Sequence, residues 1–94
     1  MVTTTNEGLL TITAQDITGQ RINRFEDISP NGRISEFTDD IVDVMDEPRE
    51  IDGRQMSYML RLDREGRLLN DSELIGDALQ TDDRVVLMPN VTAG

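Results

Sequence analysis

Apolar and polar residues alternate one by one near the beginning of the chain. The inward set is Leu10, Ile12 and Ala14, and the outward set is Thr11, Thr13 and Gln15. This period of two is typical of a half-buried strand. We expect a turn over residues 16–20, with Gly19 available for a positive φ angle, and a second strand from about Arg21.

The second strand departs from strict alternation. Its apolar residues are Ile22, Phe25 and Ile28, three positions apart. We expect all three to face the core, and their spacing predicts a bulge or an early exit from the sheet. Residues 1–8 are mostly polar and rich in threonine, and we expect a flexible leader there.

A helix is the next predicted element. The turn-forming run Ser29-Pro30-Asn31-Gly32 precedes the helix, and Asn31 or a neighbour can cap it. One predicted stripe contains Ile34, Phe37, Ile41, Val44 and Met45, and the opposite face contains Glu36, Asp39, Asp40, Asp43 and Asp46. The glycine-centred calcium loop is missing, so the carboxylates favour a solvated face, with a partner-facing acidic surface as the alternative.

The second half of the chain predicts three more strands. Residues 46–50 end the helix, and Asp52-Gly53 indicates a turn. Tyr58, Leu60 and Leu62 then alternate with polar or outward residues, Leu68-Leu69 is a short edge, and Val85 to Met88 is a buried strand bounded by Pro89. The order predicts an α+β domain in which one helix packs across a mixed sheet of four to five strands, with the last strand at its centre.

Composition narrows the classes of function. The 94 residues correspond to one domain, which we place at residues 9–89, with a flexible tail at residues 90–94. There is no cysteine and no histidine, which removes disulfides, iron–sulfur ligation and the usual nucleophiles and bases of acyl transfer. We therefore expect no enzyme, no metal and no cofactor.

The net charge and the hydropathy pattern indicate which partners and which cellular location to expect. The net charge of −10 argues against nucleic acid and favours a basic docking surface on another protein, although solubility alone also accounts for it. There is no signal-peptide pattern and no run of membrane-spanning length, so we expect a cytoplasmic protein without a membrane partner.

Three segments together resemble the ubiquitin family. They are the hairpin Ile17-Thr18-Gly19-Gln20-Arg21-Ile22, the helix spacing of Ile34, Phe37 and Ile41, and the run from Glu73 to the C-terminus with Leu74, Leu79, Gln80, Val85, Leu87, Val91 and Gly94. The resemblance covers residues 9–94 and implies a β-grasp fold. The poor similarity outside these motifs is like that of bacterial ubiquitin-like modifiers encoded beside activating, conjugating and deconjugating enzymes.

The resemblance implies a role for the last residues. Gly94 would be adenylated by an activating enzyme, passed on as a thioester, and joined to an amine or hydroxyl of a target protein. Asn90, Val91, Thr92 and Ala93 would thread the channels of the partner enzymes. Ala93 replaces the family's penultimate glycine, and Asn90 and Thr92 replace arginines, so these enzymes would need different charge recognition.

The family's receptor patch maps onto Ile17, Arg61, Val86 and Met88, with Arg61 in place of the apolar centre. The resemblance implies a monomer whose partners are an activating enzyme, a conjugating enzyme, a deconjugating protease and protein targets. Two alternatives remain. One is a non-covalent adaptor of the type VII secretion accessory type, and the other is a sulfur carrier with a C-terminal thiocarboxylate.

All nine cationic residues are arginine, and lysine is absent. An arginine-rich genome is one interpretation. The other is chemical, because a chain without lysine offers an activated C-terminus no internal lysine to attack. Only the N-terminal amine or a Ser or Thr hydroxyl could then carry a second copy.

Overall fold

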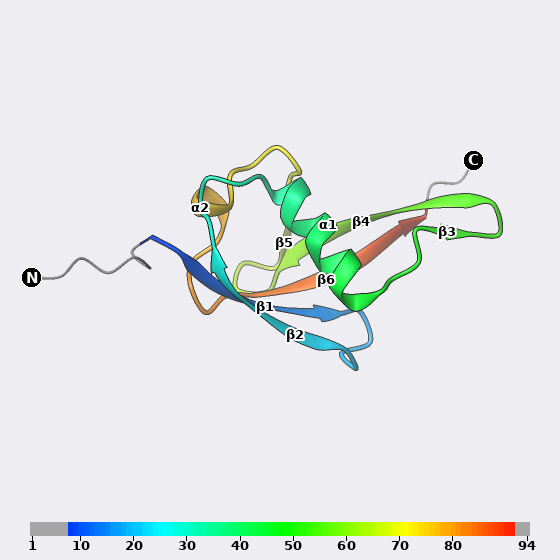
Figure 1. Cartoon of the computed structure of the whole chain (residues 1–94), viewed down its shortest axis with the longest axis horizontal. Coiled ribbons are helices and arrows are strands. Elements are labelled where there is room, and N and C mark those ends of the chain that lie inside the picture. The colour runs from blue at the N-terminus through cyan, green and yellow to red at the C-terminus, as the bar shows by residue number, and fades with distance from the viewer. Residues whose placement is uncertain (1–7, 92–94) are drawn as a thin grey trace, which may run out of the picture.

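The computed structural model describes residues 8–91, and for Ile51, Asn90 and Val91 the backbone alone. The elements in chain order are β1 (Leu10–Asp16), β2 (Ile22–Ile28), α1 (Ile34–Met45), β3 (Glu50–Ile51), β4 (Arg54–Leu62), β5 (Arg67–Leu68), α2 (Ile75–Ala78) and β6 (Arg84–Val91) (Figure 1). The strand order is β2-β1-β6-β4-β3, with β5 paired to β4. Because β6 is parallel to β1 and antiparallel to β4, the sheet is mixed, with the last strand inside it as predicted.

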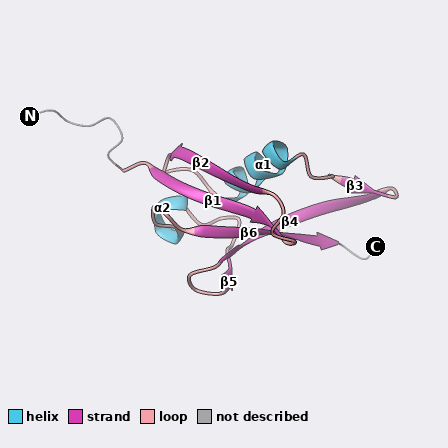
Figure 2. Cartoon of the chain, turned by 90° about the horizontal axis from the view of Figure 1, so that it is seen from below, coloured by secondary structure: helices cyan, strands magenta, loops and turns pink. Residues whose placement is uncertain are grey.

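One layer of side chains between α1 and the sheet forms the core. Figure 2 shows α1 against one face of the sheet. Among residues 8–91, α2 joins this same core through Ile75 and Ala78, so we call the other face of the sheet the uncovered face. The fully buried large side chains are Ile12, Ile34, Ile41, Leu60, Leu62, Val85 and Leu87. They come from β1, α1, β4 and β6, so the predicted α+β architecture with a helix packed across the sheet is confirmed.

The bulge predicted in β2 is present, but Ile22 does not face the core. Leu10 pairs with Ile28 and Ile12 pairs with Phe25, so three steps of β2 oppose two of β1. Asp27, with φ of 59°, takes up the extra residue. The bulge lets Phe25 and Ile28 pack against the core together. No bulge lies between Ile22 and Phe25, so the period of two puts Ile22 on the opposite face, 54% exposed.

The predicted helix forms, but its buried stripe differs at one position. Val44 is 56% exposed, and Val42 is buried instead. Val44 lies about a quarter turn from the centre of the stripe, where a short side chain does not reach the sheet. The N-cap is Arg33 rather than Asn31, and the carboxylate of Glu36 accepts the backbone N–H of Arg33 at 2.9 Å.

A second hairpin extends the sheet beyond α1. β3 pairs with the start of β4 across Asp52 and Gly53, whose φ angles of 54° and 78° fit a type I′ turn. The predicted turn is therefore confirmed, whereas β3 and the first residues of β4, before Tyr58, were missed. Two smaller differences lie in the second half. The short edge strand is Arg67–Leu68, so that Leu68 is exposed, and the four-residue α2 was missed.

The last strand continues through Pro89, where the sequence predicted its end. Asp63 N–H donates to the carbonyl of Arg84 at 3.0 Å, and hydrogen-bonded pairs alternate from there, so Pro89 falls at a non-bonded position opposite Tyr58. The nitrogen of Pro89 therefore faces the other edge of β6. There β1 has already ended, its last pair being Asp16 with Leu87. A proline at this open edge removes no hydrogen bond from the sheet.

Candidate interaction surfaces

The last described strand, β6, ends at one end of the sheet. β6 passes between β1 and β4 and then continues beside β4 alone, and Asn90 and Val91 pair with Ser57 and Met56. We call residues 88–91 the β6 arm. It ends beside the β3–β4 hairpin, at the end of the sheet opposite α2 (Figure 1). The predicted attachment residue Gly94 and its neighbours Thr92 and Ala93 lie outside the described residues.

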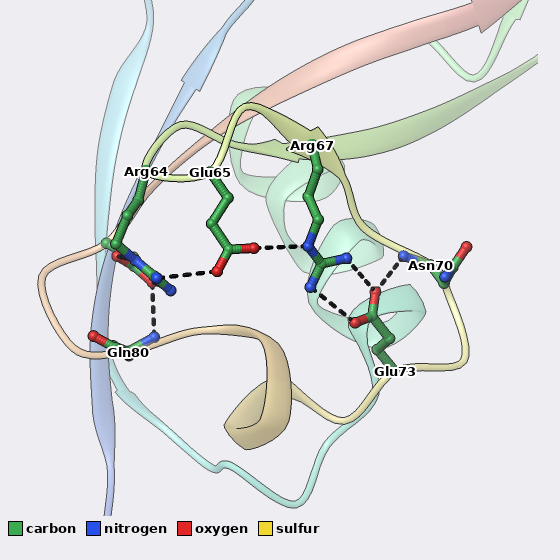
Figure 3. A network of polar contacts seen from close by, with 7 residues as sticks. Arg64, Glu65, Arg67, Asn70, Glu73 and Gln80 are labelled. Atoms are coloured by element: carbon green, nitrogen blue, oxygen red, sulfur yellow. Dashed lines mark hydrogen bonds and ion pairs between the residues drawn. The ribbon is translucent and has the colours of Figure 1, made fainter.

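A polar network anchors the beginning of β6 (Figure 3). Arg64 donates to both carboxylate oxygens of Asp83, from Nε at 2.9 Å and Nη2 at 3.2 Å, and Gln80 N–H donates to the same carboxylate at 2.8 Å. Burial raises the pKa of Asp83, but the hydrogen bonds from Arg64 and Gln80 outweigh it, so the pKa lies below its usual value. The carboxylate of Asp83 is therefore charged, and in this form it holds the turn before β6.

A second part of this network closes the loop before α2. Arg67 donates to both oxygens of Glu73, and the Asn70 N–H donates to Glu73 Oε2 at 2.6 Å. The hydrogen bond from Arg67, followed by that from Asn70, lowers the pKa of Glu73. Glu65 bridges the two parts because it accepts from both Arg64 and Arg67. The sequence contains all these charges, but their pairing depends on loops that only the fold brings together.

The four residues of the predicted receptor patch differ in exposure. Ile17 is 57% exposed at the tip of the β1–β2 hairpin, whereas Val86 is buried at 6%. Arg61 and Met88 are half-buried on the same uncovered face of the sheet, and Arg61 lies directly opposite Val86. Val86 is therefore not part of an exposed surface patch. Its register neighbours Arg61 and Gln15 flank it on both sides.

Met59 lies next to the predicted receptor patch, but the sequence analysis did not include it. It is half-buried and pairs with Met88 directly across β4 and β6. Its outward position was readable from the alternation around Leu60, but its pairing with Met88 depends on register. The two methionines form an apolar pair at the beginning of the β6 arm, and such flexible side chains suit an adaptable contact surface.

The hairpin tip that exposes Ile17 is organised by Asp16. Its carboxylate accepts the Thr18 hydroxyl at 3.0 Å and the N–H groups of Gln20 and Arg21 at 3.0 and 3.3 Å. Burial raises the pKa of Asp16, and these hydrogen bonds lower it by more, so the net shift is downward. The tip is a defined turn, with Gly19 at φ of 76° as predicted.

Most of the acidic residues on α1 have a structural partner. Asp43 accepts from Arg49 Nη2 at 2.6 Å, and Asp39 lies 3.8 Å from Arg49 Nη1. Asp46 is the left-handed C-cap, and Glu36 bonds back to the N-cap. Asp40 and Asp46 have no ion pair or side-chain hydrogen bond with another described residue, and Asp46 acts in the cap through its backbone N–H. Within residues 8–91, no group of three acidic side chains is placed to hold a metal ion.

No protein-family model and no curated protein matches the sequence. Solved structures do match the fold. Caldiarchaeum subterraneum ubiquitin has 19% identity and a TM-score of 0.68, over 93% of this chain and 100% of that chain. A ubiquitin-like domain of an Arabidopsis thaliana protein has 16% identity and a TM-score of 0.62, over 84% and 74%.

A third similar structure belongs to a larger assembly. A chain of the MycP5-free ESX-5 inner membrane complex has 17% identity and a TM-score of 0.71, over 93% of this chain and 22% of that one. The chain therefore has the ubiquitin-like β-grasp fold, as the sequence resemblance implied. Neither helix in the described part of the chain is long and apolar enough to cross a membrane.

Proposed function

We propose that this protein is a ubiquitin-like modifier whose C-terminal Gly94 is joined to target proteins. The observation that carries the proposal is the path of β6, which leads from the centre of the sheet to its far end, away from α2 and the start of β1 (Figure 1). The fold itself is the scaffold, and catalysis is left to cytoplasmic partner enzymes.

The chemistry needs only the carboxylate of this chain. A carboxylate oxygen of Gly94 attacks the α-phosphorus of ATP and displaces pyrophosphate, and a cysteine thiolate of the activating enzyme then displaces AMP. After transfer to the conjugating enzyme, an amine or hydroxyl of the target displaces that enzyme's thiolate. A glycine suits these steps because it has no β-carbon to obstruct a narrow channel.

The pairing of the β6 arm limits how far the C-terminal residues can reach into the channel of a partner enzyme. An extended chain of the three residues beyond Val91 spans at most about 10 Å. A deeper channel requires the arm to separate from β4, which is its only neighbour there among the described residues. We therefore propose that the activating enzyme contacts the arm and its surroundings, including Asn90, Met88, Arg61 and Ile17.

Trypsin gives a direct test on the natural protein. Arg84 is the last basic residue of the chain, so digestion of a conjugate leaves the segment Val85–Gly94, ten residues from 85 to 94, attached to the target. We expect mass spectrometry of the source cells to find target peptides that carry this branch. The proposal requires Gly94 to be the last residue of the mature protein, and intact mass measures that.

The matched control is a chain that ends at Ala93. It retains every described contact, and we expect it to give no branched peptide. If cells that contain the mature protein and the activating and conjugating enzymes yield no target peptide with the Val85–Gly94 branch, conjugation is refuted. An equal yield of adducts from the shortened chain would refute the role of Gly94. A gain of one sulfur in place of one oxygen at Gly94 would instead identify a sulfur carrier.

A non-covalent adaptor is the second candidate. It is favoured by the structural similarity to a chain of the ESX-5 inner membrane complex, of which this fold spans 22%. It is also favoured by the β6 arm, because the arm stays paired with β4 as far as Val91. An adaptor would retain its partners after deletion of residues 93 and 94, whereas a modifier would lose its covalent ones. Affinity capture with the full chain and with the chain lacking residues 93 and 94, each under native and denaturing conditions, separates the adaptor from the modifier.

A further inference from the structure

A pocket of about 330 Å³ lies between α1 and the first half of β4. Val42 of α1 is buried at 2%, and Met56 and Tyr58 of β4 are half-buried, so these three side chains give the pocket an apolar part. Arg49 and Asp71 also line it, from the loops before β3 and α2. The pocket therefore joins parts of the chain that are distant in sequence.

Hydrogen bonds hold the walls of this pocket in place. The Ser35 N–H donates to the carbonyl of Asp71 at 3.1 Å, which fixes Asp71 beside the first turn of α1. The Tyr58 hydroxyl donates to the carbonyl of Pro48 at 2.6 Å, which fixes the tyrosine ring against the segment before β3. The pocket is therefore formed before any partner arrives, and this lowers the entropy cost of binding.

The edge of β4 that borders the pocket has an unpaired position. The Met56 N–H donates to the carbonyl of Arg49 at 2.8 Å, and the Leu69 N–H donates to the carbonyl of Leu60 at 2.8 Å. Backbone groups of alternate residues point to the same edge of a strand, so the N–H and C=O of Tyr58 point to this edge as well. β3 pairs with the start of β4 and β5 with its end, and neither reaches Tyr58. These two backbone groups have no hydrogen-bond partner among residues 8–91.

Negative charge dominates the pocket. Asp39 and Asp71 are its acidic lining residues, and Arg49 is the one cationic residue among those described. Asp43 accepts from Arg49 at 2.6 Å, whereas Asp39 lies 3.8 Å from the same guanidinium. The carboxylate of Asp71 has no ion pair or hydrogen bond with another described residue. Because Asp43 already neutralises Arg49, the two carboxylates that line the pocket remain largely uncompensated.

We propose that this pocket binds one arginine side chain from an exposed segment of another protein. Charge complementarity selects arginine, and its apolar stem fits the part of the pocket formed by Val42 and Met56. Its five N–H donors can bond to a carboxylate and to the open carbonyl of Tyr58 together, while the Tyr58 N–H is left for a carbonyl of the same segment. A second copy of this chain is disfavoured, since each copy has a net charge of −10. The proposal does not involve Gly94, so it is independent of conjugation.

Two synthetic peptides with blocked ends test the proposal on the full chain labelled with ¹⁵N. One has the sequence Gly-Ser-Arg-Ser-Gly, and the other has citrulline, which has the shape of arginine without its charge, in the central position. We expect the arginine peptide to shift the amide signals of Ser35, Tyr58 and Asp71 in a saturable way, and the citrulline peptide to bind at least about fivefold more weakly. No saturable shift at these amides, or equal binding of the two peptides, would overturn the proposal. Shifts of the same amides when the chain alone is concentrated would identify a second copy as the occupant and would also overturn it.

Charge-matched variants locate the contact. The test pair is Asp39→Asn with Asp71→Asn, and the control pair is Asp63→Asn with Asp77→Asn. In each pair the first aspartate lies 3.8 Å from an arginine and the second has no ion pair with a described residue, and the control pair does not line the pocket. The test pair should weaken binding of the arginine peptide about fivefold, and the control pair should leave it within about twofold. Equal weakening by both pairs would reduce the effect to net charge and overturn the proposal.

Discussion

Replacing Asp83 by alanine removes the carboxylate that joins two loops at the beginning of β6. The Asp83 side chain is 7% exposed and accepts three hydrogen bonds, two from Arg64 and one from the Gln80 N–H at 2.8 Å. Alanine leaves that part-buried N–H without its acceptor.

The expected loss follows from burial. A hydrogen bond to a charged group contributes about 1.5–3 kcal/mol, and an N–H left unpaired adds a desolvation term. Arg64 is 39% exposed, so solvent screens most of its attraction. We expect Asp83→Ala to lower the free energy of unfolding by about 2–3 kcal/mol, which corresponds to about 10–15 °C in melting temperature for a domain of this size.

The pH dependence has a defined sign. The pKa of Asp83 is lowered in the folded protein, so its contribution is complete above its unfolded pKa of about 4 and is lost as pH falls through the folded pKa. The difference between wild type and Asp83→Asn should therefore be larger at pH 7 than at about pH 2 to 3. Protonation of Glu73, whose pKa is also lowered, weakens both proteins alike in this range.

Urea denaturation followed by circular dichroism measures these differences. Asp63→Ala is the control, because Asp63 is 57% exposed and lies 3.8 Å from Arg61. It should change the unfolding free energy by less than about 0.5 kcal/mol. The reasoning fails if Asp83→Ala is no more destabilising than Asp63→Ala, or if the effect of Asp83→Asn is the same at both pH values.

Two further predictions concern α1 and the β6 arm. Ile41→Ala should lower the unfolding free energy by about 2–5 kcal/mol because the side chain is fully buried. Val44→Ala should change it by less than about 1 kcal/mol, and comparable losses in urea denaturation would contradict the buried stripe. Pro89→Thr should leave the melting temperature nearly unchanged but add an N–H at the open edge, so we expect concentration-dependent association in size-exclusion chromatography. A large loss of stability, or a strictly monomeric variant, would contradict the position of Pro89 in the ladder.

Much of the fold could be predicted from the sequence because periodicity is a local property. The alternation in β1 and the stripe from Ile34 to Met45 identified a strand and a helix with most of their inward faces. The irregular spacing of Phe25 and Ile28 also predicted the bulge, since an extra residue has to restore the inward face.

Errors arose where a neighbour distant in sequence decides the outcome. The local pattern at Pro89 predicts the end of a strand. The strand continues because β1 stops beside Leu87 and leaves that edge of β6 open. Val86 lies on the uncovered face as expected, but Arg61 and Gln15 flank it in register, so it is buried. Neither fact can be obtained from local pattern.

The candidate sites divide in the same way. The sequence by itself determined the order of the longer elements, the acidic charge, and the absence of cysteine, histidine and lysine. Only the tertiary structure paired Arg64 with Asp83 and placed Met59 opposite Met88. The physical reason is that side-chain periods report which face a residue takes, whereas exposure and pairing depend on the elements that pack next to it.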